Sequence, residues 1–320
     1  MDLIYANQDH EDVGVISEYG FDLAYGVDEN DFELAVSIAD SCCEKNYLIY
    51  MEGTEYGGVV DDISVNTSSG VVTYHGRTWH GIIDGKVLTP DVGQDYYSVS
   101  GDANMVLAKV INRIGLSGLF DVEQVEAGVS VNYKFNRYCK AYSGGLLKMF
   151  AQYSLKLDVK WLDGKVCLAA KKANDYTKMD DFDSDQVNFK VKNVFNKPNH
   201  LICLGKGELA ERTVVNLYCN ENGEIGNTQS IFGADEITEI YENTSAENQE
   251  LIERGMEKFN ELLSCDTVET SLESDFIYEI GDIVGAKEQV TGISVVTRIN
   301  KKIIKINDGI ISTDYETGGF

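Results

Sequence analysis

His75 and His80 are the two histidines whose spacing comes nearest to that of a metal site. If both lay on one strand, their odd spacing would point them to opposite faces of the sheet. Zinc needs further nitrogen, sulfur or oxygen ligands, and no cysteine or carboxylate lies at metal spacing beside this pair. We therefore interpret both histidines as packing or surface residues.

The acidic run DFDSD at residues 181–185 is similar to the start of a calcium-binding loop. Such a loop requires a glycine at its sixth position and a bidentate glutamate at its twelfth. This chain has Gln186 and Lys192 at those two positions. The run therefore predicts a solvated acidic loop rather than a calcium site.

The Gly-Lys-Gly run at residues 205–207 is the nearest match to a phosphate-binding loop. It is too short for that motif and lacks the serine or threonine that should follow the lysine, which indicates a turn. The chain has no Gly-x-Ser-x-Gly motif, and none of its cysteines has an obviously activating sequence context. We therefore predict no catalytic, cofactor-binding or metal-binding residues, and no enzyme activity.

Two rival functions stay open. A carboxylate-based glycoside or peptidoglycan hydrolase needs two acidic side chains about 5–10 Å apart in a cleft, and among 53 acidic residues some pair always looks suitable. A carbohydrate-binding module would stack a sugar ring on Trp79 or Trp161. Core packing is the better interpretation of both tryptophans.

The charge of the chain limits its partners. The 53 acidic residues outnumber the 27 basic ones, and the formal net charge is −26. Such an excess argues against binding a nucleic-acid backbone through counterion release, and against adhering to anionic lipid. It suits a surface that repels polyanions.

The cysteines indicate a reducing compartment. Their number is odd, they form no Cys-x-x-Cys motif, and several lie inside apolar stretches, which predicts buried reduced thiols. The seven are Cys42, Cys43, Cys139, Cys167, Cys203, Cys219 and Cys265. The start of the chain has no apolar signal-peptide core, and no apolar run is long enough for a membrane span.

The order of predicted elements favours a mainly β fold with an α+β insert. We expect a first domain, mostly of strands, over residues 1–95 and an α+β insert over 96–190. Strands and a long helix over 191–265 would complete or link the β domains, before a C-terminal β module over 266–320. Only 2 prolines occur beside 30 glycines, which suits continuous antiparallel sheets.

Several individual elements are predicted inside these regions. Alternating patterns predict strands over 20–26 and 31–37, and hairpins over 56–75 and 156–170. A short helical turn is expected over 79–84. Three longer helices should begin at Asp102, Ser143 and Ser245, the last running to Leu263.

The closing segment, residues 276–318, reads as a separate β module. Strands are expected over 293–298, 301–306 and 310–315, the last two joined by an Asn-Asp-Gly turn. The run from Gly309 to Tyr315 echoes the run from Gly70 to Tyr74. Each has a β-branched pair after the glycine, then a hydroxyl residue and a tyrosine, so an internal duplication is one explanation.

Three stretches, taken in order, carry a family resemblance. They are residues 278–315, residues 74–83 followed by Pro90, and residues 199–208 with Arg212, followed by the helix after Ser245. The chain resembles the baseplate hub and tail-tip structural proteins of tailed phages over nearly its whole length.

This resemblance implies a homotrimer with two β-barrel-like tube domains per chain and peripheral domains outside them. Two tube domains in each of three chains form a six-fold ring that meets the tail tube. The expected partners are tail-tube or distal-tail proteins and tip or fibre proteins. DNA would pass through without specific binding, and no membrane would be involved. The expected location is a virion tail assembled in the bacterial cytoplasm, without lytic activity.

Overall fold

The alternating residues 20–37 form the centre of a large antiparallel sheet. The computed structural model describes residues 2–178, 188–192, 196–263, 267–271, 277–287, 294–307 and 309–320. The predicted strand boundaries are confirmed at β3 and β4. The sheet has ten strands: β1 Leu3–Ala6, β2 Asp12–Ile16, β3 Gly20–Gly26, β4 Asp31–Ser37, β5 Leu48–Tyr50, β6 Gly57–Asn66, β7 Val71–Thr78, β21 Ile283–Lys287, β22 Ser294–Asn307 and β23 Ile310–Gly318.

The C-terminal module extends the N-terminal sheet instead of standing apart from it. The strand order is β2-β1-β5-β6-β7-β4-β3-β22-β21, and β23 pairs with β22. One edge of β22 pairs first with β21 and then with β3, while its other edge pairs with β23. Within the described residues, no strand pairing closes this sheet into a barrel.

Strand β22 corrects the prediction of separate strands over 293–298 and 301–306. It is one strand of 14 residues, with a register shift against β23 between Ile299 and Lys301. A bulge of this kind places two residues opposite one and so breaks the alternation that the sequence was expected to show. The two echoing runs lie on β7 and β23 of this same sheet, and their duplication stays a prediction.

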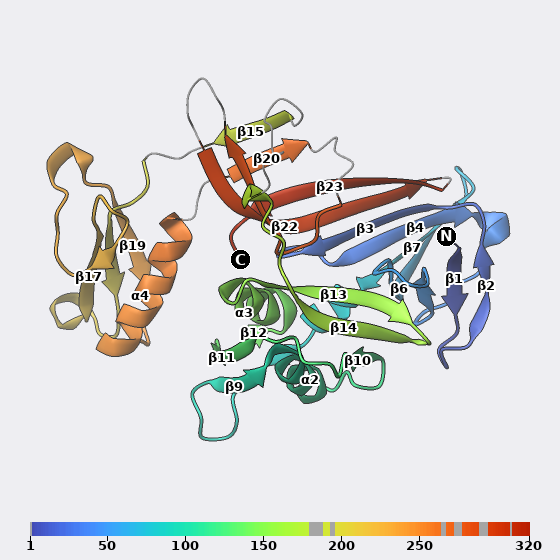
Figure 1. Cartoon of the computed structure of the whole chain (residues 1–320), viewed down its shortest axis with the longest axis horizontal. Coiled ribbons are helices and arrows are strands. Elements are labelled where there is room, and N and C mark those ends of the chain that lie inside the picture. Colours follow the sequence, from blue (N-terminus) through green and yellow to red (C-terminus); the bar gives the residue numbers. More distant parts are fainter. Residues whose placement is uncertain are drawn as a thin grey trace.

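The α+β insert has helices and small sheets packed below the large sheet (Figure 1). Helix α1 Trp79–Asp84 and strand β8 Val87–Leu88 precede residue 96, and β8 pairs with β12 of the predicted insert. The helices of the insert are α2 Ala103–Arg113, the π-helix η2 Tyr142–Leu146 and α3 Leu147–Gln152. Its strands are β9 Tyr97–Asp102, β10 Phe120–Val122, β11 Ser130–Phe135, β12 Cys139–Lys140, β13 Leu155–Leu162 and β14 Lys165–Lys172. The predicted hairpin is β13–β14, with Leu155 opposite Lys172.

Of the two helix caps predicted in the insert, the one at Asp102 is confirmed and the one at Ser143 is wrong. Asp102 caps α2 as predicted, since its Oδ1 accepts from the Asn104 amide at 2.9 Å. Ser143 does not cap a helix but lies inside η2. Its hydroxyl donates to Asp84 Oδ1 at 2.7 Å. The Ser143 oxygen therefore hydrogen-bonds to a carboxylate distant in sequence, and not to an amide of the helix that it was expected to cap.

One continuous core joins the large sheet and the insert. Buried side chains from β3, β4 and β7 pack with others from α1, α2, α3 and β13. Trp79 and Trp161 lie in this core with 0% and 2% of their surface exposed, as predicted. The two regions therefore share their apolar interior, and the boundary near residue 95 stays a prediction.

The third region is a smaller unit beside the large sheet (Figure 1). Its sheet has the order β18-β17-β16-β19, formed by β16 His200–Leu204, β17 Val214–Cys219, β18 Ile225–Gly226 and β19 Thr238–Glu242. Helix α4, Asn248–Leu263, packs on one face of this sheet. Ser245 does not cap it as predicted, because the helix begins at Asn248 and the Ser245 hydroxyl donates to Asn243 Oδ1 at 3.0 Å instead. A methyl group at Gly255 would lie 2.5 Å from Cys203 Sγ, so this glycine permits the close contact.

The remaining elements are short. β15 Asn188–Lys192 pairs with β20 Thr267–Ser271, beside β23. The 3₁₀ helices are η1 Ile38–Asp40, η3 Tyr176–Lys178, η5 Leu209–Glu211 and η6 Gly233–Asp235. No helix in the described part of the chain is long and apolar enough to cross a membrane.

Candidate functional site

The face of the large sheet opposite the core is polar and mostly acidic. Strand alternation sends Asp22 of β3, Glu33 of β4 and Asp62 of β6 to this side. Asp22 lies directly opposite Glu33, which lies opposite His75 of β7, and His75 lies opposite Asp62. Lys305 of β22 completes the row beside Asp22. This cross-strand row spans five strands, and we call the surface around it the acidic face.

A groove of about 620 Å³ runs over the acidic face. Only two permanently cationic side chains line it, those of Arg77 and Lys305. The carboxylates that line it are those of Asp22, Glu29, Asp31, Glu33, Asp61 and Asp62. The groove therefore carries an excess of negative charge in a concave surface, which concentrates the field.

The charges on this face are only partly compensated. Arg77 donates to Asp61 through two side-chain nitrogens, at 2.8 and 2.7 Å. Although partial burial opposes the shift, these hydrogen bonds lower the pKa of Asp61. Burial and the neighbouring Glu29 raise the pKa of Asp31. His75 lies 3.8 Å from Glu33 across the row.

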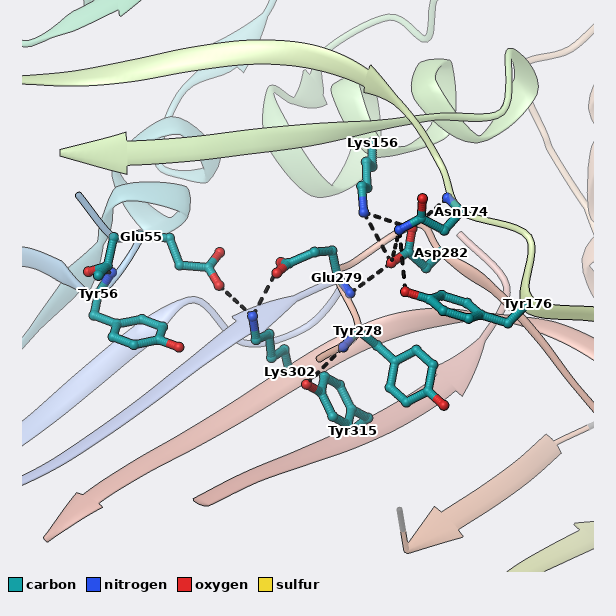
Figure 2. A network of polar contacts seen from close by, with 11 residues as sticks. Glu55, Tyr56, Lys156, Asn174, Tyr176, Tyr278, Glu279, Asp282, Lys302 and Tyr315 are labelled. Atoms are coloured by element: carbon teal, nitrogen blue, oxygen red, sulfur yellow. Dashed lines mark hydrogen bonds and ion pairs between the residues drawn. The ribbon is translucent and has the colours of Figure 1, made fainter. Parts of the chain in front are cut away.

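The opposite face of β22 contains a buried lysine (Figure 2). Lys302 is 1% exposed, and its ammonium donates to Glu55 Oε1 at 2.6 Å and to Glu279 Oε2 at 3.2 Å. Glu55 lies between β5 and β6, whereas Glu279 precedes β21. One cation thus joins the N-terminal and C-terminal segments of the chain.

A second buried charge, that of Asp282, joins the C-terminal segment to the insert. Its carboxylate is fully buried and accepts from Lys156 Nζ at 2.9 Å and from the Asn174 amide at 2.7 Å. It also accepts from the Glu279 amide at 3.0 Å. Lys156 lies near the start of β13 and Asn174 follows β14, so this carboxylate binds both chain segments at the open end of the hairpin (Figure 2). We call Glu55, Lys156, Glu279, Asp282 and Lys302 the buried junction.

Three tyrosines pack at one end of the junction. The ring of Tyr278 meets those of Tyr176 and Tyr315 edge to face, at centroid distances of 4.8 and 5.4 Å. The Tyr278 amide also donates to the Tyr315 hydroxyl at 3.1 Å. These contacts fix the chain entering the junction against β23.

The junction changes the acidity of its own members. Burial, with the neighbouring Glu55, raises the pKa of Glu279 to about 7. Burial would lower the pKa of Lys302, but Glu55 and Glu279 together hold it above its ordinary value. The lysine therefore stays charged, while Glu279 gains or loses a proton near neutral pH.

The structure places His75 and His80 on different elements. β7 ends at Thr78, which caps α1, so His80 lies on a helix and not on the strand that carries His75. His80 stacks on Tyr25 at 4.8 Å, and burial lowers its pKa to about 4. Within the described ranges, no three His, Cys, Asp or Glu side chains cluster closely enough to hold a metal ion.

The other sequence candidates have mixed outcomes. The calcium-like run at 181–185 lies outside the described residues. Residues 205–207 do form a bend, and Gly207 has a φ of +103°, which favours glycine. Trp79 and Trp161 stack on each other in the core at 5.2 Å, so neither is open to a sugar.

Sequence reasoning missed the buried junction. Its carboxylates, Glu55 and Glu279, come from opposite ends of the chain, and a hydrolase would also use two close carboxylates. Here both bind the ammonium of Lys302, and neither lines the groove over the acidic face. The one available signal was Lys302 itself, a charged residue in an otherwise apolar alternation before Ile304 and Ile306.

No protein-family model and no curated protein matches the sequence. Solved structures share its fold from end to end. The prophage tail protein gp18 from Listeria monocytogenes is 12% identical, with a TM-score of 0.54 over 100% of this chain and 95% of that one. A tail protein from Neisseria meningitidis is 10% identical, with a TM-score of 0.53 over 99% and 96%. The 43 kDa tail protein of prophage MuSo2 from Shewanella oneidensis is 11% identical, with a TM-score of 0.55 over 99% and 98%.

At such low identity these likenesses establish the fold alone. They confirm, at the level of the fold, the resemblance to phage tail structural proteins that the sequence indicated. The match runs through the large sheet, the insert and the smaller unit together, because it covers at least 99% of this chain in all three cases.

The first prediction concerns the buried ammonium. Lys302→Met leaves Glu55 and Glu279 without their shared cation, so we expect the free energy of unfolding to fall by about 3 kcal/mol. Urea denaturation followed by circular dichroism measures it. Lys305→Met, on the exposed face of the same strand, is the matched control and should change stability by less than about 0.5 kcal/mol. Equal losses in the two variants would contradict the role of Lys302.

The second prediction concerns pH. Folding raises the pKa of Glu279 from 4.5 to about 7, so the folded state holds a proton that the unfolded state has released. The resulting contribution to the free energy of unfolding is fully present below about pH 4.5 and is lost as the pH rises to 7. Because the side chain is still 38% exposed, we expect a loss of only about 1 kcal/mol. Wild type and Glu279→Gln should therefore differ in pH dependence across this window, and parallel stability curves would refute the assignment.

Proposed function

We propose that the chain is a structural component of a phage or prophage tail, of the baseplate hub or tail-tip kind. The observation that carries this proposal is the end-to-end fold match to three proteins named as tail proteins. The match covers 95–98% of those chains, so it involves their whole architecture rather than one common module.

The proposed assembly is a trimeric ring with two tube-forming parts in each chain. In this arrangement the N-terminal strands β3, β4 and β7 supply one part, and the C-terminal strands β21, β22 and β23 supply the other. The barrel-like enclosure then forms between chains, which agrees with an open sheet in the single chain. Edge strand β2, which pairs only with β1 among the described strands, offers unpaired backbone groups to a neighbour.

The acidic face is the surface that we propose lines the passage for DNA. Carboxylates repel phosphates, so DNA would pass without adhering to the wall. The cross-strand row lies on the side of the sheet that faces away from the core and is therefore open to solvent. The full burial of Phe21, Leu34 and Tyr74 on the core side supports this choice of face.

We propose no catalytic role. The proteins that share the fold are named as tail proteins, and the carboxylates of Glu55 and Glu279 are both bound to Lys302. The proposed partners are tail-tube or distal-tail proteins on one side of the ring and tip or fibre proteins on the other. The proposed location is a virion tail assembled in the bacterial cytoplasm.

The third prediction tests the trimer. Purified full-length protein should show a mass of three chains of 35.5 kDa in light scattering after gel filtration. Raising the protein concentration should increase this species. A mass of one chain at every concentration, with or without tail-tube protein, would contradict the ring while leaving the fold unaffected.

The fourth prediction tests the acidic face. Replacing Asp22, Glu33 and Asp62 by lysine should give measurable affinity for duplex DNA at low salt, at least about tenfold above wild type. The matched control replaces Glu221, Glu239 and Glu250 of the smaller unit by lysine; these side chains are also exposed, and the net charge changes by the same amount. Equal DNA affinity of the two variants would show that total charge, rather than this face, repels DNA.

A further inference from the structure

Cys42 and Cys43 bring two thiols together in the segment between η1 and β5. Their Sγ atoms are 3.6 Å apart, although side chains of neighbouring residues often diverge. No other pair of described cysteines shows such a contact, and all the described cysteines are free thiols. Cys42 is partly exposed, whereas Cys43 is 6% exposed.

The hydroxyl of Tyr74 explains why the two side chains meet. This buried oxygen accepts from the Cys42 amide at 2.9 Å and from the Cys43 amide at 3.2 Å. Both of its lone pairs are then used, so its own proton is donated to Ser41 Oγ at 2.9 Å. Two successive amides that converge on one atom fix the peptide between them, and with it the directions of both thiols.

The two thiols are unequal. The hydrogen bond from Cys43 lowers the pKa of Cys42, although partial burial opposes the shift. The same hydrogen bond and burial raise the pKa of Cys43. Because the thiolate is the nucleophile, Cys42 should react first with an external partner and Cys43 second.

We propose that Cys42 and Cys43 form a thiol–disulfide exchange site, which closes to a disulfide between neighbouring residues on reaction with a small disulfide such as oxidised glutathione. The thiolate of Cys42 attacks one sulfur of the small disulfide, forming a mixed disulfide and releasing one small thiolate. Cys43 then loses its proton to solvent and attacks the sulfur of Cys42, releasing the second small thiol. Two protein thiols are oxidised, and one small disulfide is reduced to two thiols.

The ring that forms is easily reopened. Neighbouring Cα atoms are about 3.8 Å apart across a trans peptide, below the usual span of about 4.4–6.8 Å for a disulfide. Such strain makes a disulfide more oxidising. The pair should therefore stay reduced in a reducing cytosol and close only under oxidising conditions. This inference does not depend on the proposed role in a tail.

The experiment treats the full-length protein with oxidised glutathione and follows intact mass, free thiols and modified peptides. In wild type, residues 42 and 43 should lose two thiols without retaining glutathione, and reduced glutathione should reverse the change. Cys43→Ser should accumulate a glutathione adduct on Cys42. That adduct should form at least about tenfold faster than on Cys139 or Cys167, the other partly exposed thiols among the described cysteines.

Two controls keep the test decisive. Cys42→Ser should leave Cys43 almost unmodified, because the buried thiol lacks its reactive neighbour. Tyr74→Phe removes the oxygen that fixes both amides and should let the mixed disulfide on Cys42 persist. A stable glutathione adduct on Cys42 in wild type, or a Cys42 no faster than Cys139, would overturn the proposal.

Discussion

The arrangement of this chain depends on a buried ammonium that cannot remain without anionic partners. An unpaired charge in a protein interior costs several kcal/mol, so Lys302 of β22 requires an anionic partner, and its ammonium binds both Glu55 and Glu279. Those residues come from opposite ends of the sequence, and Asp282 extends the junction to Lys156 of the insert. The large sheet, the C-terminal segment and the insert therefore have one arrangement in which all these charges are satisfied.

The two faces of the sheet follow from this arrangement. Once Lys302, Ile304 and Ile306 point inward, alternation sends Lys305 and its cross-strand row outward. The inner face is covered by the insert, and the outer face keeps an excess of carboxylates around a groove. A sheet that is apolar on one side and acidic on the other has the asymmetry that the proposed lining of a DNA passage requires.

Local patterns predicted much of the fold. The strand boundaries at β3 and β4, the cap at Asp102 and the hairpin β13–β14 all depend on neighbouring residues, and all were predicted. The failures involve distant partners. Ser143 bonds to Asp84 instead of capping a helix, and β22 runs through a bulge that divides its alternation. The cysteines were expected to be buried, but only Cys43, Cys203 and Cys219 of the described six are.

The sequence by itself determined the mainly β character, the acidic charge, the burial of the tryptophans and the resemblance to phage tail proteins. These depend on composition, alternation and motif order, which are local or additive properties. Only the tertiary structure decided that the N- and C-terminal strands form one open sheet, that Lys302 is buried between two distant glutamates, and that the Cys42 and Cys43 thiols meet. Each of these depends on contacts between residues far apart in the chain, as Tyr74 and the Cys42–Cys43 peptide show, and no local pattern encodes such contacts.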